Sequence, residues 1–217
     1  MSSATIYATD PTYSNINKGA ATLSSVLTAT TGNAISQTSN YVGLTYFASD
    51  GKYWCFQHMV KFDLSSIPVG SVISSATLTT QTPQGTVEAH TAGSQLELLP
   101  YSWGTVEDAD YLTQTEVQAI AAVATYPLTG TIAAGATQTF TSGAPLIASL
   151  TPGSSAYFML CNKAYRDGTA PTGYTDQSLR IYTTTNATSS YRPTLSIVYT
   201  AGSPATTRNA TFFGSNF

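Results

Sequence analysis

Hydrophobic and polar residues alternate along much of this chain, and the pattern is clearest between residues 59 and 78. Val60 and Phe62 alternate with charged neighbours, which is the period-two pattern of a strand with one buried face. Pro68 lacks a backbone donor and Gly70 tolerates positive φ, so this pair predicts a turn. A second β-type run begins at Val72. The stretch therefore predicts a strand, a tight turn and another strand.

Similar short runs recur along the chain, separated by clusters of Gly, Pro, Asn and Ser. The predicted strands are Thr5–Thr9, Thr22–Thr30, Val42–Phe47, Lys52–Phe62, Val72–Gln81, Gln95–Leu99, Tyr157–Asn162, Ser178–Thr184 and Thr194–Thr200, with Thr86–His90 and Thr137–Thr141 as further candidates. Many short strands with frequent turns indicate an antiparallel β-sandwich rather than a parallel sheet.

One helix is predicted over Thr115–Ala124, a segment rich in Ala with an acidic residue near its start. Thr113 or Thr115 is positioned to cap it. We expect this helix to cover one open end of the sandwich.

Three motifs carry a family resemblance. Residues 62–78, FDLSSIPVGSVISSATL, closely resemble the core motif of DNRLRE-type domains; Trp103 and the segment 191–199, YRPTLSIVY, are similar to later parts of that family. The resemblance spans about residues 3–200 and implies a jelly-roll β-sandwich that binds glycans or surfaces. We thus predict an all-β antiparallel jelly-roll sandwich with one short helix over residues 1–200, followed by a C-terminal aromatic segment, 201–217.

Composition places the chain among surface-exposed β proteins. Charged residues make up only 9% of the 217 residues, whereas 25 Ser and 37 Thr supply a surface solvated by hydroxyl groups. A chain of this length suits one large β domain. This composition is typical of an extracellular or particle-surface protein more than of a cytosolic enzyme.

Charge and hydropathy exclude two classes of partner. The net charge is −3, and the Lys and Arg residues are scattered, so we expect no nucleic-acid binding. No apolar run is long enough to cross a membrane, and the N-terminal residues do not form a secretory signal. Either a signal was removed and Met1 added, or the protein leaves its cell by another route such as phage lysis, which we favour. We therefore expect location on a virion or, alternatively, outside the cell.

The two cysteines, Cys55 and Cys161, each lie in an apolar strand-like run. They can be buried free thiols that act as small hydrophobic residues. They can also form an inter-strand disulfide, provided that their Cα atoms lie within about 7 Å.

Catalytic chemistry finds little support. Glu107, Asp108, Asp110 and Glu116 cluster around the start of the predicted helix, where carboxylates could hydrolyse glycosides but ordinarily cap and solvate a helix. The sequence contains no nucleophile elbow and no glycine-rich phosphate loop. We expect that the protein is not an enzyme.

Metal binding has one weak candidate. Glu88 and His90 share a strand face, and Glu97 or His58 could complete a site. With only two histidines in the chain, we instead expect His58 to be a hydrogen-bonded core residue. We therefore expect no metal and no cofactor of this kind.

Calcium is a separate candidate ligand, because it prefers carboxylate and carbonyl oxygens of loops. Asp10 and Asp176 are the loop residues that could bind it, although no dense acidic loop is present.

Sugar binding needs flat aromatic faces with a few planar polar groups beside them. The loop 162–177 is the most polar long loop, and loops on a rigid scaffold commonly carry binding sites. The candidate ligand-binding residues are Tyr165, Arg166, Asp167, Tyr174 and Asp176. The alternative is an ordered surface loop held by turn contacts of Arg166 and Asp167. Trp103 fits the core better than a sugar platform.

The C-terminal segment ends with three phenylalanines, Phe212, Phe213 and Phe217, which we expect to dock on this domain or on a neighbouring subunit. Our leading hypothesis is a non-enzymatic structural protein of a phage virion, a capsid decoration or tail component. Its partners would be other virion proteins or copies of itself, with host surface glycan as a further ligand. The alternatives are a secreted carbohydrate-binding module and a glycan-degrading enzyme.

Overall fold

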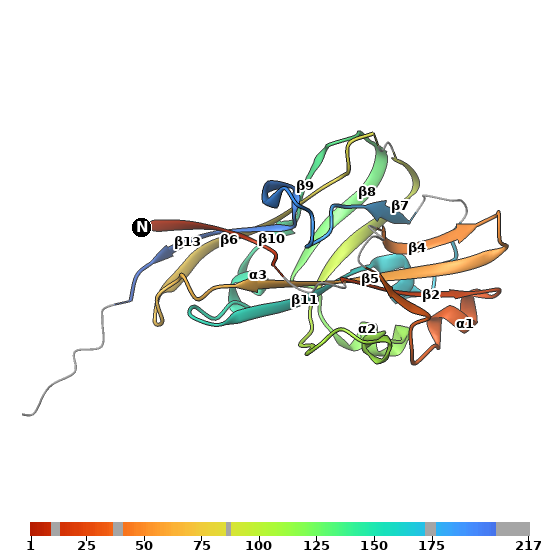
Figure 1. The fold of residues 1–217 in the computed structure, drawn as a ribbon, viewed down its shortest axis with the longest axis horizontal. Coiled ribbons are helices and arrows are strands. Elements are labelled where there is room, and N and C mark those ends of the chain that lie inside the picture. Colours follow the sequence, from red (N-terminus) through yellow and green to blue (C-terminus); the bar gives the residue numbers. More distant parts are fainter. Residues whose placement is uncertain (10–13, 37–40, 86–87, 172–176, 203–217) are drawn as a thin grey trace, which may run out of the picture.

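The computed structural model describes residues 1–9, 14–36, 41–85, 88–171 and 177–202, and these form two antiparallel sheets packed face to face (Figure 1). This arrangement confirms the predicted antiparallel β-sandwich. Residues 59–78, which have the clearest alternating pattern in the sequence, connect the two layers. The strand β5 (Lys52–Asp63) belongs to one sheet, the turn contains Gly70 at φ +78°, and β6 (Val72–Gln81) belongs to the other.

The smaller sheet has four strands in the order β1-β13-β6-β9. Besides β6, its strands are β1 (Ser2–Tyr7), β9 (Thr137–Thr139) and β13 (Thr194–Thr200). The closing strand and β6 begin and end at the predicted residues.

The larger sheet has nine strands: β10-β8-β7-β11-β5-β2-β3 in order, with β4 also paired with β5 and β12 paired with β4. Besides β5, its strands are β2 (Asn15–Ala20), β3 (Ala34–Ser36), β4 (Tyr41–Phe47), β7 (Glu88–Pro100), β8 (Ala124–Ile132), β10 (Thr141–Ser142), β11 (Ser155–Asn162) and β12 (Ser178–Arg180). The sequence did not predict β2, β3 or β8.

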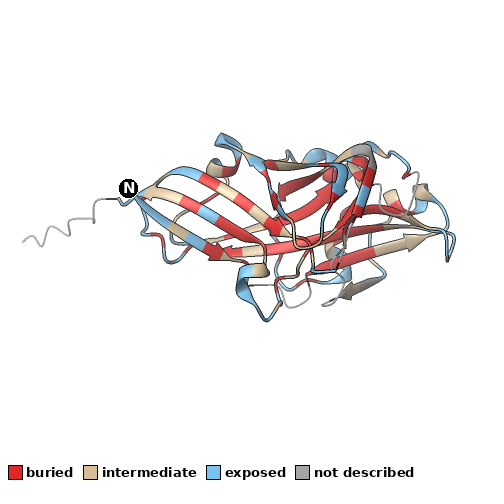
Figure 2. Cartoon of the chain, turned by 90° about the horizontal axis from the view of Figure 1, so that it is seen from above, coloured by how far each residue is buried: buried red, intermediate tan, exposed pale blue. Residues whose placement is uncertain are grey.

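The main core lies between the two sheets, where alternate residues of facing strands meet (Figure 2). Val60 and Phe62 of β5 pack there with Leu78 of β6 and Ile197 of β13. The apolar positions of the sequence pattern thus form the sandwich interior.

A second core covers the opposite face of the larger sheet. Cys55, Met59 and Met159 belong to this second core. Short helices cover this face of the larger sheet (Figure 1). Three helices contribute to this second core: α1 (Leu23–Leu27), α2 (Gln114–Ala119) and α4 (Lys163–Asp167). The described residues also form the helix α3 (Ala144–Ala148) and the 3-10 turns η1 (Asp108–Asp110) and η2 (Ser189–Tyr191). The prediction of one helix at an open end was wrong, because the larger sheet has two apolar faces and the second also requires a cover.

Two predicted elements differ from the structure for identifiable reasons. The segment around Val26 was predicted as a strand but forms α1, whose N-cap Thr22 accepts a hydrogen bond from the backbone of Ser25. Helix α2 begins at Gln114 after Thr113, one of the two predicted caps, but ends well before Ala124, which pairs with Leu98 in the larger sheet. Strand pairing there prevails over the helix propensity of alanine.

No helix of the described residues is long and apolar enough to cross a membrane.

Candidate functional site

Tyr165 was predicted to lie in a surface loop, but it does not. It lies on α4 and is fully buried in the second core, where its hydroxyl donates a hydrogen bond to the carbonyl of Leu112 at 2.8 Å. Burial raises the pKa of this phenol above its usual value. The prediction of Tyr165 as a sugar platform was wrong, because a helix turns its ring inward.

Arg166 and Asp167 hold α4 in place. The Arg166 Nε donates to Glu97 Oε2 at 2.6 Å, and its Nη2 donates to the carbonyl of Ile120 at 2.8 Å. Asp167 forms an exposed ion pair with Lys163, one helical turn away. Both side chains are thus engaged within the protein. Their predicted role in ligand binding gains no support from this geometry.

Several other predicted residues lie outside the described residues. They are the ligand candidates Tyr174 and Asp176, the calcium candidate Asp10, and the docking candidates Phe212, Phe213 and Phe217.

The acidic cluster before α2 caps helical turns. Asp110 Oδ2 accepts a hydrogen bond from the backbone of Glu107 at 2.8 Å, and Glu116 Oε2 accepts one from the backbone of Thr113 at 2.8 Å. Each pair forms a capping box. The capping interpretation of these carboxylates is confirmed.

The metal candidates are divided between two faces of the larger sheet. Glu88 and His90 are buried on the face toward the sandwich interior, whereas Glu97 pairs with Arg166 on the helical face. Among the described residues, no three His, Cys, Asp or Glu side chains are grouped closely enough to hold a metal ion.

His58 is buried as expected, but neither ring nitrogen has a hydrogen-bond partner among the residues that the structure describes. The prediction of a hydrogen-bonded histidine was therefore wrong. Burial disfavours the charged imidazolium and lowers its pKa from 6.5 to about 3.

Cys55 and Cys161 are both free and both fully buried in the second core. Burial is the main cause that raises the pKa of the Cys55 thiol well above its usual value, and the neighbouring Cys161 adds to it. Of the two interpretations, the structure has the buried thiols and not the disulfide.

A cluster of four aromatic rings lies on β4 and β5, which we call the aromatic platform: Tyr41, Phe47, Trp54 and Phe56. The indole of Trp54 is nearly parallel to the ring of Phe56, with 6.1 Å between the ring centroids and 17° between their planes. Among the described residues, neither hydrophobic core includes these four rings. Phe56 is buried, whereas Tyr41, Phe47 and Trp54 are half-buried.

Trp54 lies flat on the neighbouring strand β2. Gly19 is its cross-strand partner, and a Cβ atom placed on Gly19 would come within 2.6 Å of the indole carbons Cε2 and Cζ2. One face of the indole therefore rests on the glycine backbone and the other face points away from the sheet. The indole Nε1 donates to Asp50 Oδ2 at 3.1 Å, which places an exposed carboxylate at the rim.

Gly43 shapes the other end of the platform. Its φ of +112° is unfavourable for other residues, and a Cβ there would lie 2.4 Å from the carbonyl of Gln177. Tyr41 and Phe47 lie on either side of this glycine in β4, and their rings approach to 6.2 Å.

A charged pair borders the platform. The Arg180 guanidinium lies 5.6 Å from the centre of the Tyr41 ring and forms an ion pair with the buried Glu88. The second carboxylate oxygen of Glu88 has no hydrogen-bond partner within the described part of the chain. Sequence reasoning did not identify the aromatic platform. The spacing of Trp54 and Phe56 could have indicated it, because residues two apart in a strand share a face.

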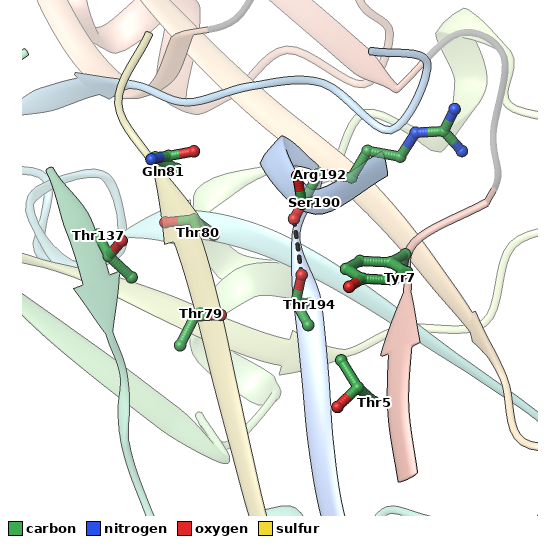
Figure 3. A pocket seen from close by; sticks show the side chains of 9 residues that line it. All are labelled: Thr5, Tyr7, Thr79, Thr80, Gln81, Thr137, Ser190, Arg192 and Thr194. Atoms are coloured by element: carbon green, nitrogen blue, oxygen red, sulfur yellow. Dashed lines mark hydrogen bonds between the residues drawn. The ribbon is translucent and has the colours of Figure 1, made fainter. Parts of the chain in front are cut away.

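A second candidate lies on the outer face of the smaller sheet. It is a hollow of about 240 Å³, which we call the hydroxyl hollow, lined by Thr5, Tyr7, Thr79, Thr80, Gln81, Thr137, Ser190, Arg192 and Thr194 (Figure 3). The short turn η2 rises at one end of the sheet and forms a wall of the hollow (Figure 3).

No protein-family model matches the chain, and no curated protein is detectably similar to it. The fold defines an antiparallel β-sandwich. The resemblance to DNRLRE-type domains, which rests on short motifs, stays a prediction.

Proposed function

We propose that this chain is a non-catalytic glycan-binding β-sandwich module and that the aromatic platform is its binding surface. The observation that carries the proposal is the position of Trp54, whose half-buried indole lies flat on Gly19 with its other face directed away from the sheet. The apolar face of a sugar ring packs on such a surface, as in other contacts of aromatic side chains.

Polar groups around the platform suit the hydroxyl groups of a sugar. Asp50 is exposed, and its carboxylate is held at the indole Nε1, so it can accept hydrogen bonds from a sugar stacked on Trp54. At the other end, Arg180 supplies a planar guanidinium beside Tyr41, held there by an ion pair with the buried Glu88. Charge-assisted hydrogen bonds of this kind give orientation as well as affinity.

The sequence supports a setting for this activity. The low charge, the hydroxyl-rich composition and the DNRLRE-type motifs favour display on a phage virion, as a capsid decoration or tail component, with a secreted module as the alternative. In the virion setting, the C-terminal phenylalanines would dock the module on other virion proteins or on another copy, and the platform would contact surface glycan.

A glycan array followed by calorimetry tests the proposal. The wild-type protein should bind a defined set of glycans, and Trp54→Ala should weaken that binding about tenfold or more, equivalent to about 1.4 kcal/mol. Tyr53→Ala is the matched control: Tyr53 is the preceding residue of β5, its half-buried ring packs on Tyr46, and it lies on the opposite face.

Equal losses in the two variants would show that the aromatic platform is not the binding surface. An array without any hit for the wild-type protein would contradict glycan binding altogether. Asp50→Asn, which keeps the hydrogen bond from Trp54 but removes the charge, should change the relative affinities within the set.

A further inference from the structure

The outer face of the smaller sheet carries hydroxyl groups almost throughout. Tyr7, Thr194 and Thr79 are cross-strand neighbours in register on three adjacent strands, and their chain neighbours Ile6, Leu195 and Leu78 point to the core. The hydroxyl hollow lies over this row (Figure 3). The row belongs to the smaller sheet, whereas the aromatic platform lies on β4 and β5 of the larger sheet.

Most hydroxyl groups of the hollow have no partner within the described protein. Thr194 donates to the carbonyl of Arg192 at 2.9 Å, and Thr80 donates to Gln138. The others that line it make no hydrogen bond among the described residues: Thr5, Tyr7, Thr79, Thr137 and Ser190. Each of these hydroxyls can both donate and accept, so together they match a ligand rich in hydroxyl groups.

The wall of the hollow is held in place before any ligand binds. In η2, the ring of Tyr191 stacks on Tyr182 with 4.8 Å between centroids, and the Tyr182 hydroxyl accepts a hydrogen bond from the backbone of Gln84. The Arg192 Nε donates to the carbonyl of Asn186 at 2.7 Å. A preformed wall reduces the entropy lost on binding.

Charge at the hollow favours an uncharged ligand. The four strands of this sheet contain no acidic or basic residue. Arg192 is the only charged residue of the lining, and its guanidinium points away from the row of threonines (Figure 3). The volume is about eight times that of a water molecule, enough for a single sugar ring.

We propose that the hydroxyl hollow is a second ligand site that binds one neutral sugar unit, with the Tyr7 ring beside the sugar and the free threonine hydroxyls bonded to its hydroxyl groups. The module then has two binding surfaces, on different sheets, and can hold two chains or two parts of one glycan. Two weak sites joined in this way raise the avidity for a multivalent surface.

An NMR titration of the whole chain tests this site. Glucose, galactose and mannose serve as neutral probes, and glucuronate serves as the anionic probe of similar size. At least one neutral sugar should shift the backbone amides of Thr79, Thr137 and Thr194 saturably, with a Kd in the range of about 1–10 mM for so small a ligand. Thr79→Val and Tyr7→Phe, which remove hydroxyls with little change of shape, should each weaken binding about threefold or more.

Thr77→Val is the matched control, because Thr77 lies on the same face of β6 and outside the lining. It should bind as the wild type does, and thermal melts should show that all three variants are folded. Trp54→Ala should leave this titration unchanged, which separates the second site from the aromatic platform. The proposal is overturned if no neutral sugar shifts these amides, if Thr79→Val and Tyr7→Phe bind like the wild type, or if glucuronate binds more tightly than every neutral probe.

Discussion

The indole of Trp54 lies flat against the backbone of Gly19 on the adjacent strand, where a single methyl group would collide with the ring. Gly19 has no positive φ, so its role is to leave space rather than to allow an unusual backbone. The two residues are 35 positions apart in the sequence, and only the pairing of β2 with β5 brings them together.

Gly19→Ala should therefore displace the indole. We expect a change in the near-ultraviolet circular dichroism and fluorescence of tryptophan, and a loss of about 1 kcal/mol in the free energy of unfolding, because the strain of overpacking exceeds the backbone gain of alanine. Gly104→Ala is the control, since a Cβ there meets open space. Identical spectra for Gly19→Ala and the wild type would show that the indole does not rest on this glycine.

Acid should destabilise the protein through His58. Its pKa is about 3 in the folded state and 6.5 when exposed, so the unfolded chain binds the proton more readily between these values. The free energy of unfolding should fall as the pH drops below about 6.5, by at most about 1.4 kcal/mol per pH unit from this residue. Urea unfolding of His58→Leu should show a shallower decline from pH 6.5 to 4, and an unchanged slope would contradict this assignment.

The ion pair between Glu97 and Arg166 should matter more for stability than the one between Asp167 and Lys163. Glu97 and Arg166 have side chains only 6% and 16% exposed, so Glu97→Ala leaves a nearly buried guanidinium without its partner and should cost about 2–4 kcal/mol. Asp167→Ala in the same helix removes an exposed pair and should cost less than about 0.5 kcal/mol. Chemical denaturation measures both, and equal losses would argue against a structural role for the Glu97 pair.

The two cysteines should be inert in the native protein. Burial without solvent contact and a raised pKa of Cys55 both suppress the thiolate, the form that reacts. Iodoacetamide followed by mass spectrometry should modify neither Cys55 nor Cys161 under native conditions and both after denaturation without reductant. A fraction that needs reductant before it reacts would reveal a disulfide.

The sequence predicted the sandwich well where one strand face is apolar and the other polar. Val72–Gln81 and Thr194–Thr200 have the predicted bounds, since alternation with a period of two leaves little freedom in register. The sequence did not predict the strand Asn15–Ala20, because most of its residues are polar or small and it is buried by its neighbours. It also did not predict the helix Lys163–Asp167, which is short, has ordinary helix propensity and is held by the Arg166 ion pair.

For the candidate sites, the sequence indicated the types of residue but not which residues form the site. The residue types for sugar binding, flat aromatic rings beside carboxylate and guanidinium groups, could be named from the sequence, but the residues chosen were wrong at Tyr165. The direction in which a ring points depends on the element that carries it, and a helix of five residues between a strand and a glycine gave no periodic signal.

By itself, the sequence determined the layer structure: alternating apolar residues must be removed from water, and short strands with frequent turns do so in packed antiparallel sheets. Only the tertiary structure decided that the larger sheet is covered on both faces, that Tyr165 is buried whereas Trp54 is half-buried against Gly19, and that threonines from separate strands meet at one hollow. The physical reason is that each of these outcomes depends on contacts between residues far apart in the chain, and local pattern cannot specify which distant strand will be the neighbour.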